Sequence, residues 1–232
     1  PGLLAGLDAL AKSKDPVTHL PSIGRWRAAG SKGDYNPNIE ASRQEMRSFV
    51  CAQCHVEYYF KGDAKLVVFP WQNGLKMDQI ESYYDTIAFK DFVHKDSGAN
   101  ALKAQHPEFE TWSQGIHADN GVTCADCHMA YQRDGAAKVS NHDVTSPMES
   151  EASINASCLT CHHSTATEMK ERVDTIQNRW YEDQDISFAA FDEFIADLEA
   201  AAKDGTATEE QLTIARDYQR RASFMIDYTI SE

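Results

Sequence analysis

The chain has 232 residues and a formal net charge of −14, with 42% hydrophobic and 10% aromatic residues. This hydrophobic content is too high for a disordered chain, and so acidic a surface repels phosphate backbones, which argues against a nucleic-acid partner. No apolar run approaches the roughly 18 residues that a membrane-spanning helix needs. The composition therefore indicates a folded, acidic protein with no membrane span in this segment.

The elements expected in the first two thirds of the chain are short. Apolar periodicity and turn residues predict, in chain order, a helix over residues 3–10, an irregular loop over 15–38, a helix over 41–50, strand structure within 56–75, mixed helix and loop over 77–116, and a polar linker over 131–153. Because only one of these segments has strand character, we expect a mainly α protein.

The last third is expected to form two long helices. No Gly or Pro interrupts residues 164–204, and apolar residues recur there at steps of three and four, which predicts one helix of about 40 residues. Gly205 is typical of a residue that ends a helix, and Thr208 with Gln211 fits the capping box of a following helix through Ile230. The two helices are expected to be antiparallel, and they could pack within the chain or form a dimer interface.

All six cysteines fall into three Cys-x-x-Cys pairs, and a histidine follows each pair at once. Two thiols at this spacing can reach both vinyl groups of one porphyrin as thioethers, and the next residue is then held beneath the iron as its proximal imidazole ligand. The pattern therefore predicts three covalently bound c-type haems, attached at Cys51, Cys54 and His55, at Cys124, Cys127 and His128, and at Cys158, Cys161 and His162.

Two other uses of paired cysteines fit less well. A zinc ribbon has no need of a histidine after each pair, and disulfides within such pairs would close small, strained rings. Haem attachment would use every thiol, so haem packing and helices must support the core. Since haem c is attached outside the cytoplasm as a rule, we expect a periplasmic or extracytoplasmic location.

Three low-spin irons need six axial ligands, of which the motifs supply three. The other histidines are candidates for the remaining positions, and spacing alone does not choose among His19, His94, His106, His117, His142 and His163.

Four stretches resemble the ammonia-forming cytochrome c nitrite reductases, a family of five-haem enzymes, and occur in the same order. They are the run Cys51–Phe60, which is similar to the third haem motif of the family, the loop Leu102–Glu108, the approach Gly115–Cys124 to the fourth motif, and Asn141-His142 ahead of the fifth. The resemblance implies a mainly α multihaem cytochrome c with a haem-packed core and long C-terminal helices.

The resemblance also implies a calcium site and one wall of an active site. Calcium would be held by the side chains of Glu57 and Gln105 and by the carbonyl oxygens of Tyr58 and Lys103, and such oxygen ligands suit this ion. Tyr58 and His106 match the residues that contact nitrite above the catalytic iron.

Two distal ligands follow from the resemblance. His117 would bind the iron opposite His162, and His142 would bind the second haem of the family. His19, His94 and His163 match no ligand position, so we expect them to be surface or packing residues.

The chain lacks several motifs of the family pattern. It has no Cys-x-x-Cys-Lys motif, which binds the catalytic haem of the family, and neither the second haem motif nor the arginine that helps to bind nitrite is present. We therefore expect the three-haem middle part of a five-haem enzyme, inactive alone. It would consist of a multihaem domain over 1–163, with the calcium and active-site loop, and a helical hairpin over 164–232 at a dimer interface.

The complete enzyme would bind haem c and calcium and reduce nitrite to ammonium with six electrons. The resemblance implies a homodimer that receives electrons from a quinol-linked or cytochrome donor. Two alternatives remain, a three-haem electron carrier without chemistry of its own and a part of an octahaem relative.

Overall fold

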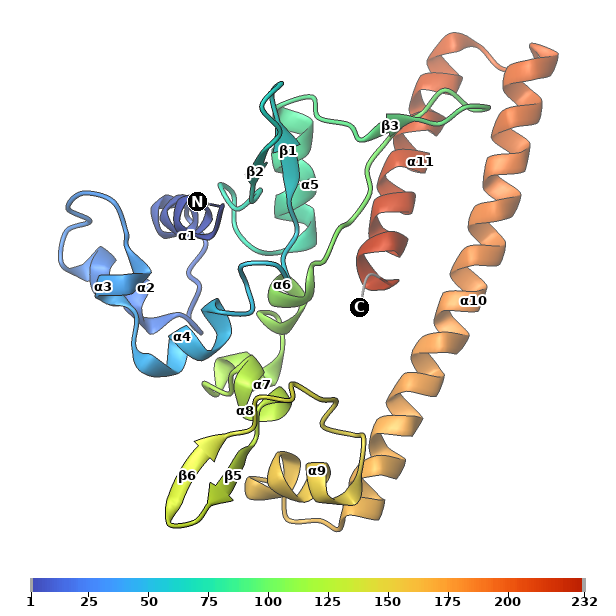
Figure 1. Ribbon diagram of the computed structural model, residues 1–232. Coiled ribbons are helices and arrows are strands. Elements are labelled where there is room, and N and C mark those ends of the chain that lie inside the picture. Colours follow the sequence, from blue (N-terminus) through green and yellow to red (C-terminus); the bar gives the residue numbers. More distant parts are fainter. Residues whose placement is uncertain (1, 231–232) are drawn as a thin grey trace.

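The computed structural model describes residues 2–230, and helices dominate it (Figure 1). The helices are α1 (Gly2–Lys12), α2 (Pro21–Ala28), α3 (Pro37–Glu40), α4 (Arg43–Phe49), α5 (Met77–Thr86), α6 (Glu108–Trp112), α7 (Ile116–Asp119), α8 (Cys124–His128), α9 (Glu151–Ala156), the 3₁₀ turn η1 (Cys158–Thr160), α10 (Ala166–Asp204) and α11 (Glu209–Ile230). Three antiparallel two-stranded hairpins complete the described chain: β1 (Tyr59–Lys61) with β2 (Leu66–Val68), β3 (Phe92–Val93) with β4 (Asn100–Ala101), and β5 (Tyr131–Asp134) with β6 (Ala137–Ser140). The mainly α fold predicted from the sequence is confirmed.

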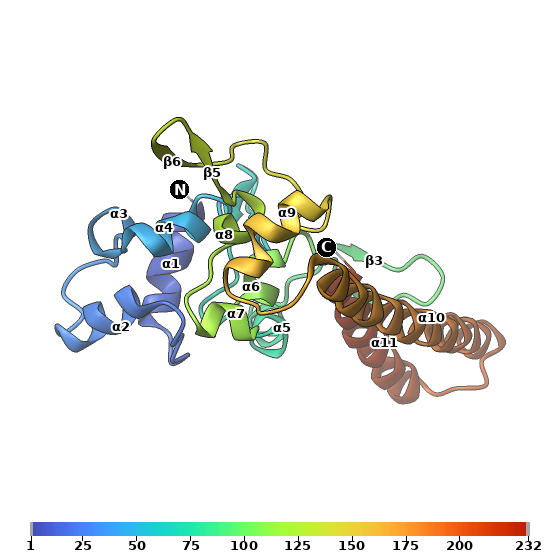
Figure 2. The same ribbon diagram turned by 90° about the horizontal axis from the view of Figure 1, so that it is seen from below.

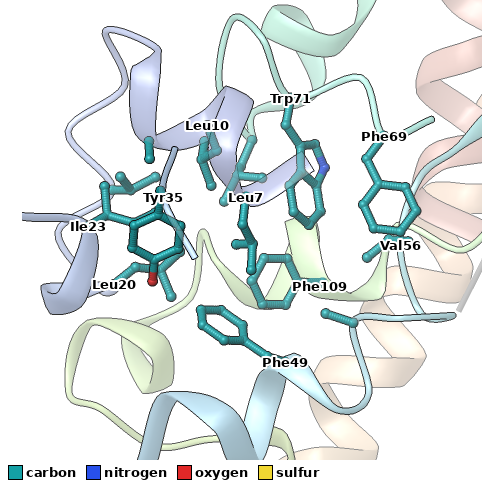
Figure 3. Packing of buried hydrophobic residues seen from close by; sticks show 14 of the residues in the cluster. Leu7, Leu10, Leu20, Ile23, Tyr35, Phe49, Val56, Phe69, Trp71 and Phe109 are labelled. Carbon is teal, nitrogen blue, oxygen red and sulfur yellow. The ribbon is translucent and has the colours of Figure 1, made fainter. Parts of the chain in front are cut away.

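The first hydrophobic cluster brings α1 against the segment after β2 and against α6 (Figure 3). Leu7 is fully buried there, and Trp71 stacks on Phe109 with ring centroids 5.4 Å apart. Gly6 permits the close approach of α1, because a Cβ at this position would lie only 2.8 Å from the Cδ2 atom of Phe69. This cluster packs against the segment that carries the first cysteine pair.

A second cluster joins α11 to the middle of the chain. Tyr84 on α5 meets Phe224 on α11 edge to face, with ring centroids 6.1 Å apart. Beside them the largely buried guanidinium of Arg220 donates to Oδ1 of Asp85 at 3.0 and 3.1 Å. It also donates to the carbonyl oxygens of Phe89 at 2.9 Å and Asn100 at 3.1 Å. These bonds fix α11 to α5 and to β4.

Helix α10 has 39 residues and spans about 58 Å at ~1.5 Å per residue. Its first turn has a capping box, since Thr165 accepts from the backbone N–H of Glu168 and the Glu168 carboxylate accepts from that of Thr165. Gly205 ends the helix with a φ of 66°, a left-handed conformation that glycine adopts without strain. The predicted helix and its stop are confirmed.

Helices α10 and α11 lie side by side and antiparallel along one side of the molecule (Figures 1 and 2). The backbone N–H of Thr208 donates to Oε1 of Gln211 at 2.9 Å, and that of Gln211 to Oγ1 of Thr208 at 3.3 Å, as the predicted capping box requires. The hairpin forms within the chain. No helix in residues 2–230 is long and apolar enough to cross a membrane.

Two of the predicted irregular segments are wrong in part. The loop over 15–38 contains α2, which begins at Pro21, where the fixed φ of proline suits the first helical position. The polar linker over 131–153 contains the hairpin β5–β6, which turns between Asp134 and Ala137 with Gly135 at a φ of 57°. An Asp-Gly pair favours such tight turns, so polarity alone was a misleading signal.

Candidate functional site

Each of the three Cys-x-x-Cys-His motifs begins a short helical turn. The first follows the end of α4, where the backbone N–H of His55 donates to the carbonyl oxygen of Cys51 at 3.0 Å. The second forms α8, and the third occupies η1, where the N–H of His162 donates to the carbonyl of Cys158 at 2.9 Å. One helical turn places residues i, i+3 and i+4 on one side, so both thiols and the histidine of a motif face the same way.

The thiols are in a state that suits covalent attachment of haem. All six are free, and none is fully buried. Within residues 2–230 no three His, Cys, Asp or Glu side chains form a group that could hold a metal ion directly, so the cysteine pairs do not converge on a zinc site. The residues present therefore fit three separate porphyrin attachments better than a shared metal.

The middle motif lies between the other two. A hydrogen bond from the Cys124 thiol lowers the pKa of Cys51 to about 6 and, together with burial, raises that of Cys124. Burial, followed by the charge of Cys158, raises the pKa of Cys127. The first cysteine of the middle motif thus lies near the first motif, and its second cysteine lies near the third.

The histidines of the first two motifs differ in what their Nδ1 atoms contact. Nδ1 of His55 lies 3.2 Å from Oε1 of Glu108, and Nδ1 of His128 lies 3.2 Å from the carbonyl oxygen of Thr145. In both rings Nε2 remains for a metal. An acceptor at Nδ1 fixes the tautomer of an imidazole that binds a metal through Nε2.

The rings of His117 and His162 lie close together, edge to face. Their centroids are 6.2 Å apart and their planes cross at 86°. Two imidazoles bound through nitrogen on opposite faces of one metal, with metal–nitrogen bonds of about 2 Å, have centroids roughly 6 Å apart. The pair therefore has the separation that axial ligation of a single iron requires.

The predicted calcium ligands gather where two distant segments meet. Glu57 is fully buried, and its carboxylate accepts from the hydroxyl of Tyr84 at 2.7 Å and from the backbone N–H of Gln105 at 2.7 Å. The side-chain amide of Gln105 lies 3.5 Å from the carbonyl oxygen of Lys103. Burial raises the pKa of Glu57 to about 8. Tyr58 adjoins this carboxylate in the chain.

The predicted active-site pair lies on these same two segments. Tyr58 is half-buried with its ring against Phe60, and His106 follows Gln105 with its side chain 58% exposed. Nδ1 of His106 lies 3.7 Å from Oε1 of Glu108. The hydrogen bond between Glu57 and Gln105 therefore keeps the two segments together, and Glu108 lies between His106 and the first haem motif.

The remaining histidines are dispersed. His142 is exposed after β6, and His163 is exposed beside His162. His19 packs edge to face on Trp112 with ring centroids 5.5 Å apart, and burial lowers its pKa. Nδ1 of His94 contacts Ser97.

Glu110 is a site residue that the sequence analysis missed. It is fully buried on α6, where Oε1 accepts from the indole N–H of Trp71 at 2.6 Å and from the backbone N–H of Glu57 at 3.0 Å. Burial raises its pKa well above the usual range. Phe109 and Trp112 lie one residue before and two residues after it, a spacing that does not place the three side chains on one helix face, so the sequence offered no signal for its burial.

The helical motifs, their paired thiols and the free Nε2 atoms define a c-type cytochrome, a class whose cofactor is haem c. The sequence model of the cytochrome c552 family matches residues 22–232, and the chain belongs to this family.

Relatives agree with this assignment. The chain is 44% identical over 194 residues to the cytochrome c-552 of Porphyromonas gingivalis, covering 83% of this chain and 38% of that protein. It is 39% identical over 232 residues to the cytochrome c-552 of Haemophilus influenzae, covering 99% of this chain and 40% of that protein. The chain thus spans about two fifths of the length of these curated relatives.

A solved structure is also similar. It is the cytochrome c nitrite reductase of Desulfovibrio desulfuricans ATCC 27774, described as a catalytic subunit with two calcium sites. The TM-score is 0.76 at 31% identity, and the match covers 91% of this chain and 46% of that one. The family expected from the motifs is confirmed.

Proposed function

We propose that this chain forms the three-haem part of an ammonia-forming nitrite reductase with five haems. The observation that carries the proposal is the hydrogen bond between Glu57 and Gln105, because it brings the segment of Tyr58 to the segment of His106 beside a haem motif. A chain that only relayed electrons would have no need of this pairing. The solved nitrite reductase of similar fold supports the same substrate.

The three motifs hold the haems, which when bound supply electron transfer. His55, His128 and His162 would hold the iron atoms through Nε2, and His117 would be a second ligand of the haem at Cys158 and Cys161. A haem held by two histidines supplies electron transfer and has no position for substrate. His142 would hold a further haem of the complete enzyme. Because the middle motif lies near the other two, haems at the three motifs would give electrons a path through this chain.

Tyr58 and His106 bind nitrite and move its protons. The Tyr58 hydroxyl donates a hydrogen bond to one substrate oxygen, and the His106 ring donates a proton to an oxygen as its bond to nitrogen breaks. Nitrite is an anion whose oxygens gain charge during reduction, so donors held in place before the reaction lower the barrier.

A calcium ion held by Glu57, Gln105 and the carbonyl oxygens of Tyr58 and Lys103 keeps these donors in place. Each carboxylate oxygen of Glu57 already accepts one hydrogen bond and retains a lone pair for a cation. The buried carboxyl is costly to ionise without a counter-charge, and a divalent cation would supply that charge. Burial thus favours a cation at this carboxylate.

The proposal also includes the location, the electron donor and the oligomeric state of the enzyme. We place it in the periplasm, with a quinol-linked or cytochrome electron donor, as a homodimer through α10. Ile176 and Ile186 are 58% and 68% exposed on this helix, which gives a partner apolar surface to cover.

Haem content and product of the native polypeptide test the proposal. We expect five haems per chain and one ammonium ion per nitrite consumed, with a reduced dye as electron source. Three haems and no nitrite consumption would overturn it in favour of the electron carrier. Eight haems would indicate the octahaem relative.

A further inference from the structure

Glu108 occupies a position that neither the family assignment nor the proposed chemistry explains. Its Oε1 atom lies 3.2 Å from Nδ1 of His55 and 3.7 Å from Nδ1 of His106. Thus one carboxylate oxygen faces both the proximal ligand of the first motif and the proposed proton donor. The two histidines belong to segments about 50 residues apart in the sequence, and Glu108 contacts both.

The backbone fixes this arrangement. Glu108 is the first residue of α6, and the backbone N–H of Phe109 donates to the carbonyl oxygen of His55 at 3.1 Å. Phe109 itself is buried in the first hydrophobic cluster. The helix that carries Glu108 is therefore tied directly to the haem motif, and this bond holds the backbone of Glu108 beside the His55 ring.

The contact has a consequence for His55 as an iron ligand. When Nδ1–H donates to an acceptor, the tautomer is fixed and Nε2 binds the metal, and a carboxylate acceptor increases the donor strength of the imidazole. A stronger donor stabilises the ferric state and lowers the reduction potential. His128 donates instead to the uncharged carbonyl of Thr145, so it provides an internal comparison.

We propose that Glu108 is a positioning residue that orients the rings of both His55 and His106 and lowers the reduction potential of the haem at Cys51 and Cys54. This inference rests on the proposed haem ligation by His55 and adds a residue to it. The side chain of Glu108 itself binds neither iron nor substrate. It links the first haem motif to the residue proposed to supply protons.

The test uses the haem-loaded native protein and two variants. Glu108→Gln keeps the size of the side chain but removes its charge, whereas Glu108→Asp keeps the charge but shortens the reach by one methylene. We expect both variants to raise the potential of one haem in a spectroscopic redox titration. We also expect both to alter the low-spin electron paramagnetic resonance signal of that haem, with the signals of the others unchanged.

Three outcomes of this test lead to different conclusions. A shift in Glu108→Gln alone would show a long-range charge effect and overturn the positioning role, and no shift in either variant would overturn the proposal altogether. A native protein without haem, by contrast, would refute the proposed function itself. Glu149→Gln, at an exposed acid in the loop after β6, serves as the control and should leave every potential unchanged.

The link to His106 needs a second measurement. If Glu108 acts on nitrite reduction by orienting His106, Glu108→Gln should lower turnover in the native background but have little further effect in His106→Ala. Additive losses in the double variant would contradict this part of the proposal. The redox titration would still report on His55 independently.

Discussion

Oε2 of Glu57 accepts a hydrogen bond of 2.7 Å from the backbone N–H of Gln105, which lies 48 residues further along the chain. This bond joins the segment after the first haem motif to the loop before α6. Every residue proposed to bind calcium or nitrite lies within one residue of one of its two ends, except Lys103, which lies two residues before Gln105.

We expect Glu57→Gln to weaken calcium binding by at least about tenfold, since changes even to residues behind a metal ligand cost that much. Gln keeps the size of the side chain but cannot supply the negative charge that a buried divalent cation needs. Isothermal titration with calcium, after chelation of the haem-loaded protein, measures the effect, and Glu149→Gln is the control. Equal calcium affinity in the native protein and in Glu57→Gln would show that calcium does not bind at this position.

Removal of calcium from the native enzyme should lower nitrite turnover more than it lowers helix content. The ion is proposed to position Tyr58 and His106 rather than to hold the hydrophobic clusters together. Turnover and far-ultraviolet circular dichroism before and after chelation compare the two effects. Unaltered turnover in a metal-free preparation would contradict the proposed role.

His106→Ala should lower nitrite turnover by about 10²-fold to 10⁴-fold, the range that a general acid contributes. Haem content should stay at the native level, because the exposed ring is not proposed to bind iron. Steady-state kinetics and a pyridine haemochrome assay measure the two quantities. A missing haem would instead identify His106 as an axial ligand.

Two glycines in neighbouring helices should respond to alanine in opposite directions. In α1, Gly6→Ala would force a Cβ to 2.8 Å from the ring of Phe69, and such overpacking costs about 1–3 kcal/mol. In α2, a Cβ at Gly24 meets nothing within 4 Å, so Gly24→Ala should stabilise by about 0.5–1 kcal/mol through helix propensity. Urea unfolding of the haem-loaded variants gives both values, and equal signs would show that α1 is not packed as described.

Arg220→Ala should destabilise the protein by about 2–4 kcal/mol, because two carbonyl oxygens lose their donor along with the ion pair to Asp85. Amide hydrogen exchange should accelerate most in α11. Arg43→Ala, at the exposed start of α4, is the control and should change stability by no more than about 0.5 kcal/mol. Similar losses in the two variants would mean that Arg220 does not anchor α11.

The parts of the fold that could be predicted carry local signals. The long helix α10 follows from apolar spacing, and its end at Gly205 follows from the conformational freedom of glycine. The hairpin at Asp134-Gly135 also has a local signal, but the surrounding polar residues concealed it. The three cysteine motifs needed no structure because covalent attachment fixes their spacing.

The parts that could not be predicted depend on contacts between distant residues. Glu110 looks like an ordinary helix acid, and only the fold brings Trp71 and the backbone of Glu57 to its carboxylate. Glu108 is similar, because its hydrogen bond with His55 arises from the pairing of α6 with the first motif. Sequence spacing gives no information on such long-range hydrogen bonds.

The two hydrophobic clusters need different lengths of the chain, so a chain that folds from its N-terminus can complete the first cluster before the second. The first cluster uses buried residues only up to Phe109, whereas the second needs Phe224 and Tyr228 from α11. All six cysteines precede α11 in the chain. As such a chain emerges N-terminus first outside the cytoplasm, every cysteine appears before α11, so each thioether can form while the second cluster is still open.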